Sequence, residues 1–164
     1  LLHDVGMLAI SSKILDAPRA LTQEELTKMR THVNIAESIL KQYLDHEIVE
    51  IAVAHHERSN GSGYYRGLKE EEMNTLQKIL QIADTVTGMI NPRSYRAAKS
   101  KDFVVNVLED EANHGRFNRT IVKIFIGHYE KIMEQVHLES DRILILHNKL
   151  NAQYNQAYDN IRKV

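Results

Sequence analysis

Hydrophobic residues recur at spacings of three and four along much of the chain, which is the period of an amphipathic α-helix. The clearest example starts with a capping box formed by Thr22 and Glu25. Leu21 and Leu26 occupy the two positions of a hydrophobic staple around it. From Leu26 the apolar stripe continues to about Tyr43. The pattern therefore predicts one helix from Thr22 to about Tyr43.

The same period predicts four further helices. They run from about Glu47 to His56, from about Glu71 to Ile90, from Phe103 to Ala112, and from Arg119 to about Val136. No segment shows the alternation that is typical of a half-buried strand, so we predict an all-α helical bundle. On the helix that begins at Glu71, the core-facing residues are expected to be Leu76, Ile79, Leu80 and Ala83.

The C-terminal residues repeat an apolar spacing that is typical of a short coiled-coil seam. Gln153 interrupts this seam. The seam fits packing on the domain's own core and homodimerisation through the helix equally well. We therefore predict a domain at residues 1–128 and an extended C-terminal helix at residues 129–164, a candidate dimerisation element. The seam residues are Ile143, Leu146, Leu150, Ala157, Ile161 and Val164.

Composition narrows the functional classes. A length of 164 residues suits one domain with its own core. The formal net charge of −1 argues against a protein that binds DNA or a membrane through a broad basic surface. The chain has no cysteine, so nitrogen and oxygen must hold any metal, and a cytoplasmic location is expected. Because the chain begins at Leu1 without an initiator methionine, we expect it to be part of a longer protein.

Six histidines and aspartates fall on or beside the predicted apolar faces. Burying several imidazoles and two carboxylates without partners would be costly, and metal coordination is the commonest way to offset that cost. Four imidazoles and two carboxylates suit two ions, with Asp4 as the natural bridge. Such a pair activates water and neutralises phosphoryl oxygens, which indicates phosphoester hydrolysis. The six candidate ligands are His3, Asp4, His32, His55, His56 and Asp84.

Ligand chemistry also limits the metal. Nitrogen and oxygen ligands without sulfur favour iron or manganese, with zinc or nickel as alternatives. The remaining histidines have no comparable neighbours and are not expected to bind metal. They are His46, His114, His128, His137 and His147.

The segment HDVG, which starts at His3, resembles the HDxGK signature of HD-superfamily phosphohydrolases. The order of His32, the HHE and GSGY segments and Asp84 is similar to the HD-GYP subfamily over about residues 1–128. The resemblance implies an all-α HD domain with a binuclear or trinuclear iron or manganese centre. It also implies a bacterial phosphodiesterase that converts cyclic-di-GMP to linear pGpG or GMP. By position, the six candidates match the family's metal ligands, with Asp4 as the bridge on which catalysis depends, and we expect two ions.

The resemblance also assigns residues around the substrate, a cyclic dinucleotide. Tyr64, in the glycine-rich loop, is expected at the rim of the pocket. Arg93 and Arg96 lie in a segment that resembles the family's RxYR-like segment and are expected to bind phosphates. Glu57 is expected either to orient a ligand histidine or to be a solvated carboxylate at a helix end. A GGDEF-type cyclase is an implied partner through the GYP loop.

Three positions depart from the HD-GYP pattern. Met7 replaces the signature lysine, Tyr65 replaces the GYP proline, and Thr87 replaces a second aspartate. Losing the lysine could lower the rate about ten- to a hundredfold. Besides the active phosphodiesterase, which we expect, the alternatives are a degenerate module that binds nucleotide or a partner protein without turnover, an HD phosphohydrolase for another phosphoester, and a helical scaffold without a site.

Overall fold

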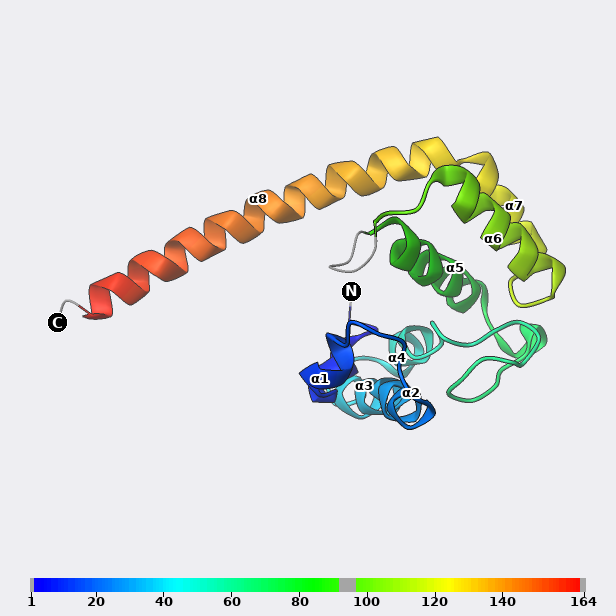
Figure 1. Cartoon of the computed structure of the whole chain (residues 1–164), viewed down its shortest axis with the longest axis horizontal. Coiled ribbons are helices and arrows are strands. Elements are labelled where there is room, and N and C mark those ends of the chain that lie inside the picture. The colour runs from blue at the N-terminus through cyan, green and yellow to red at the C-terminus, as the bar shows by residue number, and fades with distance from the viewer. Residues whose placement is uncertain (1, 92–96, 163–164) are drawn as a thin grey trace. The chain divides into compact units, whose positions relative to one another are not determined.

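The computed structural model describes residues 2–91 and 97–162, and its regular structure is helical (Figure 1). Within these ranges there is no strand, although Asn60 and Lys69 form an isolated antiparallel bridge. The predicted all-α fold with an extended C-terminal helix is confirmed. The 3-10 helices are η1 (Val5–Ala9) and η2 (Glu70–Glu72), and the α-helices are α1 (Ser12–Leu15), α2 (Gln23–Arg30), α3 (His32–Leu40), α4 (His46–Ala52), α5 (Thr75–Ile90), α6 (Lys101–Asn113), α7 (Arg119–Gly127) and α8 (Tyr129–Arg162).

The chain divides into two compact units, residues 1–123 and 124–164. In the first unit α3 packs against η1 and α4, α4 packs against α5, and α5 packs against α6. Buried apolar residues of α3 and α4 form a cluster at the centre of this packing, so the cluster joins the two helices that precede the histidine-rich turn. The domain boundary predicted at residue 128 stays a prediction. The cluster contains Val33, Leu40, Val49 and Val53.

The helix predicted from Thr22 to Tyr43 is two helices, because the chain breaks at Thr31. The Thr31 hydroxyl and backbone N–H both donate to the Lys28 carbonyl. The carbonyl of Met29 accepts the ring Nδ1–H of His32. Side chains therefore use carbonyls that a continuous helix would give to backbone N–H groups. The predicted capping box of Thr22 and Glu25 is present at the start of α2.

The predicted core face of α5 is wrong in part. Leu76 is 55% exposed and Ile79 is 44% exposed. The buried face instead includes two glutamines whose side-chain N–H groups have partners. Gln77 donates to the Glu50 carbonyl, and Gln81 donates to the Met73 sulfur. The buried residues of α5 are Gln77, Gln81, Ile82, Val86 and Met89.

Other helix boundaries also differ from those predicted. Helix α4 ends at Ala52 and not at His56, so both histidines of the HHE segment lie in the following turn. Helix α5 starts at Thr75, where Asn74 provides a capping box that the sequence analysis missed. The helix predicted from Arg119 to Val136 breaks at His128, whose N–H is shared between two carbonyls of the preceding turn.

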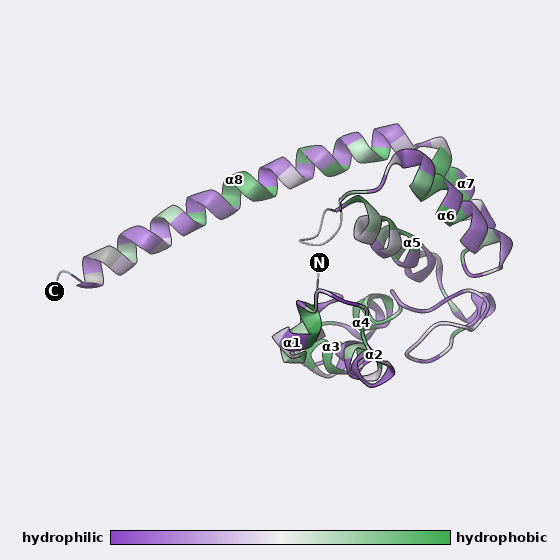
Figure 2. Ribbon diagram, viewed as in Figure 1, coloured by the Kyte–Doolittle hydropathy of each residue, from purple (hydrophilic) through white to green (hydrophobic). Residues whose placement is uncertain are grey.

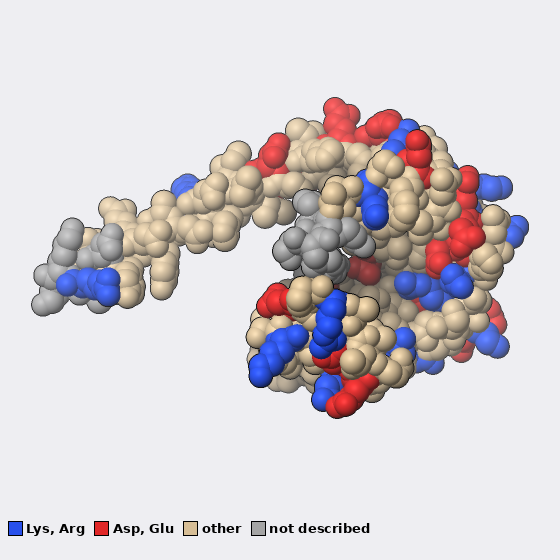
Figure 3. Space-filling model, in the orientation of Figure 1, with Lys and Arg blue, Asp and Glu red and all other residues tan. Residues whose placement is uncertain are grey.

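In the second unit, α8 has 34 residues, which corresponds to about 51 Å at 1.5 Å per residue. Hydrophobic and hydrophilic residues alternate along it (Figure 2). The seam residues Ile143, Leu146 and Leu150 are each more than half exposed. In the described part of the chain, no helix combines the length and apolar character that a membrane span needs. Acidic and basic side chains intermix over the face in Figure 3, in keeping with the net charge of −1.

Gly6 allows η1 to lie directly against the start of α3. A Cβ atom on Gly6 would lie 1.9 Å from the His32 carbonyl oxygen and 2.7 Å from the Ala36 nitrogen. Both neighbours are backbone atoms of α3, so neither can move aside by a rotamer change. The close approach brings Asp4, two residues earlier, next to His32.

We expect Gly6→Ala to separate η1 from α3 and to lower the free energy of unfolding by about 3 kcal/mol or more. Urea denaturation followed by circular dichroism would measure the change. Gly127→Ala is the matched control, because a Cβ at Gly127 meets nothing within 4 Å. An unfolding midpoint for Gly6→Ala equal to that of the control would contradict the close-packing argument.

Candidate metal centre

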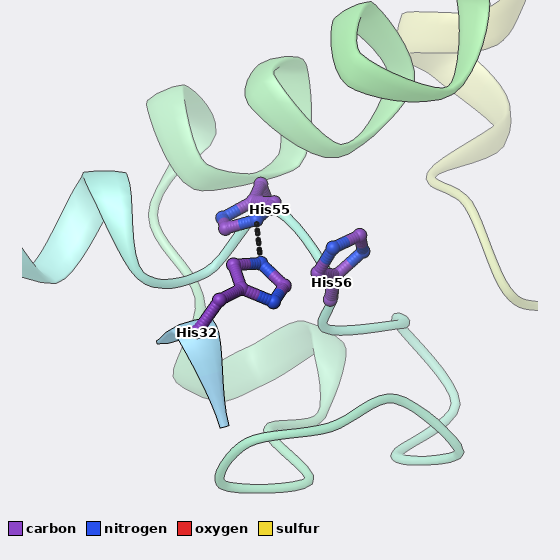
Figure 4. A group of neighbouring side chains, drawn as sticks. All are labelled: His32, His55 and His56. Carbon is purple, nitrogen blue, oxygen red and sulfur yellow. Dashed lines mark hydrogen bonds between the residues drawn. The ribbon is translucent and has the colours of Figure 1, made fainter. Parts of the chain in front are cut away.

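Four separate segments bring the six predicted ligands together. His3 and Asp4 precede η1, and His32 is the first residue of α3. His55 and His56 lie in the turn after α4, and Asp84 lies on α5. Figure 4 shows the rings of His32, His55 and His56 converging on one another.

His32 and His55 are positioned by the same local device. The ring Nδ1 of His32 lies 2.7 Å from the Met29 carbonyl, and the ring Nδ1 of His55 lies 2.8 Å from the Ala52 carbonyl. Both carbonyls belong to the last turn of a helix, where backbone oxygens lack intrahelical partners. A carbonyl can only accept, so Nδ1 carries the proton in both rings. In the neutral imidazoles, Nε2 therefore presents a lone pair.

The two lone pairs face each other. The Nε2 atoms of His32 and His55 are 3.2 Å apart, and both side chains are fully buried (Figure 4). Two acceptors cannot form a hydrogen bond, so a cation between them is required for a favourable contact. Burial lowers the pKa of His32, which disfavours a proton in that role. Nitrogens that bind one ion at about 2.1 Å stand about 3 Å apart at a right angle, so the pair fits a divalent metal ion.

Asp4 connects this pair to a third histidine. Its Oδ1 lies 3.5 Å from Nε2 of both His32 and His55, while its Oδ2 lies 3.3 Å from Nε2 of His3. Asp4 precedes η1 as its N-cap residue, but its side chain makes no capping hydrogen bond. The carboxylate is thus directed at the histidines. A hydrogen bond from Nε2–H of His3 holds the pKa of Asp4 well below its ordinary value.

Asp84 extends the cluster in the same way. Its Oδ1 lies 3.6 Å from Nε2 of His3, and its Oδ2 lies 4.0 Å from Nδ1 of His56. Hydrogen bonds with Asp4 and Asp84 raise the pKa of His3 to about 9. Burial, together with the neighbouring His55, lowers the pKa of His56 to about 3. The cluster therefore contains one imidazole that readily accepts positive charge beside others that resist a proton.

These side chains form two overlapping groups that share His55. His32, His55 and His56 form one group, and His3, Asp4 and His55 form the other. Within each group, one potential ligand atom per residue lies within 4.8 Å of the others, so each group can hold a divalent ion. A pocket of about 380 Å³ opens over His3, Asp4 and Asp84. The centre is thus accessible to a ligand.

Glu57 organises the loop that follows the histidines. It is 1% exposed, so it is not the solvated carboxylate that was one expectation. Its Oε1 accepts the N–H groups of Tyr65 and Arg66, and its Oε2 accepts the N–H of Leu68. Glu57 therefore holds the loop backbone, and these bonds do not reach the ring of a ligand histidine.

Contacts that the sequence analysis missed fix the start of this loop. The Arg58 guanidinium donates to the His55 and Glu57 carbonyls and lies over the ring of the buried Phe117. Ser59 donates its N–H to the Arg116 carbonyl. The turn before α7 therefore anchors the segment that carries the histidine pair. The sequence offered one sign of this contact, the aromatic Phe117 inside an otherwise polar turn.

The predicted substrate residues have different outcomes. Tyr64 lies at the centre, with its ring stacked on His56 at 4.6 Å. Arg93 and Arg96 lie outside the described residues. Met7 lines a largely apolar pocket of about 540 Å³ beside Asp4, so this side of the centre receives no charge from position 7.

The sequence of this chain is similar to a protein family and to several known proteins. The family model described as HD domain matches residues 1–121. A cyclic di-GMP phosphodiesterase of Thermotoga maritima is 33% identical over 143 residues, covering 85% of this chain and 39% of the relative. A 3'3'-cGAMP-specific phosphodiesterase of Vibrio cholerae is 34% identical over 111 residues, covering 67% of this chain and 24% of the relative. The chain thus spans two fifths or less of the length of these relatives.

We expect metal binding to stabilise the protein through the histidine cluster. Manganese(II) at about a hundred times its dissociation constant should raise the free energy of unfolding by about 2.7 kcal/mol relative to protein in chelator. His55→Ala, and His3→Ala at a partly exposed position, should each lose most of that increment. Calorimetric scans with metal and with chelator measure it. His46→Ala, at an exposed site, is the control, and equal increments in all four proteins would refute the ligand assignment.

Glu57→Gln should loosen the loop without removing volume. The amide presents a donor where the carboxylate accepts, so at least one buried loop N–H loses its partner, at a cost of about 2 kcal/mol. Amide hydrogen exchange at Tyr65, Arg66 and Leu68 should accelerate. The control is Glu71→Gln, at an exposed position near the same loop. Unchanged exchange at all three amides would show that the carboxylate does not hold the loop.

Proposed function

Because this chain belongs to the HD domain family, and within it to the HD-GYP group, we propose that it is a metal-dependent phosphodiesterase that hydrolyses a cyclic dinucleotide. The proposed substrate is cyclic-di-GMP, and the products are linear pGpG or GMP. The observation that most supports this proposal is the placement of Asp4, whose two oxygens face different histidines. A carboxylate in that position suits two metal ions held side by side.

We further propose that the six clustered residues hold two divalent ions, with iron or manganese preferred over zinc or nickel. When bound, such a pair supplies a hydroxide nucleophile at neutral pH and neutralises charge on the phosphoryl oxygens. The protein's part is to fix the ligands. The Met29 and Ala52 carbonyls keep His32 and His55 in the tautomer whose Nε2 can bind. Asp4 would bridge the two ions.

Substrate groups would enter through the pocket over His3, Asp4 and Asp84. Tyr64 would contribute its hydroxyl at the rim, and burial raises the pKa of that hydroxyl, so it stays protonated at neutral pH. Arg93 and Arg96 would bind phosphates, as the family resemblance implies. Met7 provides no charge, so the phosphates depend on other cations.

A second candidate substrate is 3'3'-cGAMP. Relatives in Vibrio cholerae that are about as similar as the cyclic di-GMP enzymes are named as 3'3'-cGAMP-specific phosphodiesterases. The two substrates differ only in one base, so the phosphodiester chemistry proposed at the metal centre is the same for both. The degenerate, non-catalytic module is less favoured, because these relatives are named as phosphodiesterases.

Partners and location follow from the same family membership. A GGDEF-type cyclase is a proposed partner through the loop that contains Tyr65. A homodimer through α8 is proposed because the seam residues Ile143, Leu146 and Leu150 are exposed along that helix. A cytoplasmic location fits both the proposed substrate and the absence of cysteine.

We expect protein reconstituted with manganese(II) or iron(II) to cleave cyclic-di-GMP or 3'3'-cGAMP in a chromatographic assay. Asp4→Asn should lower kcat/KM by about a thousandfold, or ~4 kcal/mol in activation free energy, because it removes the bridging charge. Asp16→Asn, at an exposed position, is the control. Met7→Lys should raise the rate by up to about a hundredfold if the missing cation limits it. Failure of the metal-loaded wild type to cleave either dinucleotide would refute the proposed function.

A further inference from the structure

Arg30 lies beside the histidine cluster, although nothing in the sequence pattern singles it out. It is the last residue of α2, two positions before His32. Its guanidinium carbon lies 5.0 Å from the centroid of the Tyr64 ring. The His56 ring stacks on the same Tyr64 ring at 4.6 Å with an interplanar angle of 26°. The Tyr64 ring therefore contacts both Arg30 and a candidate metal ligand.

This arrangement leaves the guanidinium free to bind an anion. Arg30 is exposed, and it has no carboxylate partner among the residues that the structure describes. Four other arginines in those ranges are paired with carboxylates. Arg19, Arg66, Arg116 and Arg142 each form a salt bridge with a glutamate. The N–H groups of Arg30 are therefore available to a ligand, while stacking on Tyr64 restricts where they point.

Contacts through Tyr64 link Arg30 to the candidate metal ligands. The Arg30 guanidinium lies over the Tyr64 ring, which stacks on His56. Nδ1 of His56 in turn lies 4.0 Å from Oδ2 of Asp84. Arg30 therefore places a positive charge close to the residues that would hold the metal ions.

We propose that Arg30 binds the second phosphodiester group of a cyclic dinucleotide while the first group lies at the metal centre. This inference rests on the proposed function. A cyclic dinucleotide carries two phosphodiester groups, and only one of them can be at the reacting position. The planar guanidinium binds a phosphate through two parallel N–H donors, which suits a fixed anion at the rim. Arg30 is thus a substrate-binding residue, held in place by Tyr64.

The test compares two phosphodiesters on manganese(II)-loaded protein. For cyclic-di-GMP, Arg30→Gln should lower kcat/KM about tenfold or more, mainly through KM, and Arg30→Lys should have a smaller effect because it keeps the charge. For bis(4-nitrophenyl) phosphate, which has a single phosphodiester group, Arg30→Gln should stay within about twofold of wild type. Lys28→Gln is the matched control on α2, because Lys28 is exposed and paired with Glu24.

Several outcomes would overturn the proposal. Equal losses for both substrates would mean that Arg30 acts on the metal centre itself, and a lower melting temperature in Arg30→Gln would indicate a structural role. If wild type cleaves neither cyclic dinucleotide, the proposed function fails, and calorimetric titration with cyclic-di-GMP then tests Arg30 directly. Weaker binding by Arg30→Gln than by Lys28→Gln would sustain the proposal. Equal affinities, or no binding by wild type, would refute it.

Discussion

Two buried imidazoles whose unprotonated nitrogens face each other at 3.2 Å are the constraint around which this molecule is organised. The contact is unfavourable by itself, because each Nε2 offers a lone pair and neither offers a proton. The fold nevertheless enforces it from both sides. The last turns of α2 and α4 each end in a carbonyl that takes the Nδ1–H of the histidine three residues later. The free carbonyls at these two helix ends therefore determine which ring nitrogen of His32 and His55 carries the proton.

Gly6 has a comparable role in positioning Asp4. If η1 stood farther from α3, the Asp4 carboxylate could not reach His32 and His55 together. The space that a side chain at position 6 would occupy is already filled by the backbone of α3. Gly6, the glycine of the HDxG segment, offers no ligand atom, but its lack of a side chain lets the candidate metal ligands come together. Close packing at Gly6 is therefore needed to place the Asp4 carboxylate.

The six candidate ligands could be predicted from the sequence, whereas several helix boundaries could not. Residue type and family order are visible in a sequence, and they sufficed to find His3 and Asp84 in segments far apart. The break at Thr31 depends on hydrogen bonds from the Thr31 hydroxyl and the His32 ring to carbonyls, and periodicity does not record these bonds. The buried face of α5 was predicted wrongly for a related reason. The side-chain N–H groups of Gln77 and Gln81 donate to acceptors at Glu50 and Met73, and the periodicity of α5 does not record where those acceptors lie.

The replacement of the GYP proline by Tyr65 shows how a departure from a family pattern can be accommodated locally. A proline at this position would have no N–H, yet here the Tyr65 N–H donates to the buried carboxylate of Glu57. The Tyr65 hydroxyl adds a bond to Glu37 on α3. In place of the ring that fixes the backbone angle in proline, Tyr65 makes two hydrogen bonds, one to Glu57 and one to Glu37. Because Glu57 directly follows His56, this alternative way of holding the loop also supports the turn that carries the histidine pair.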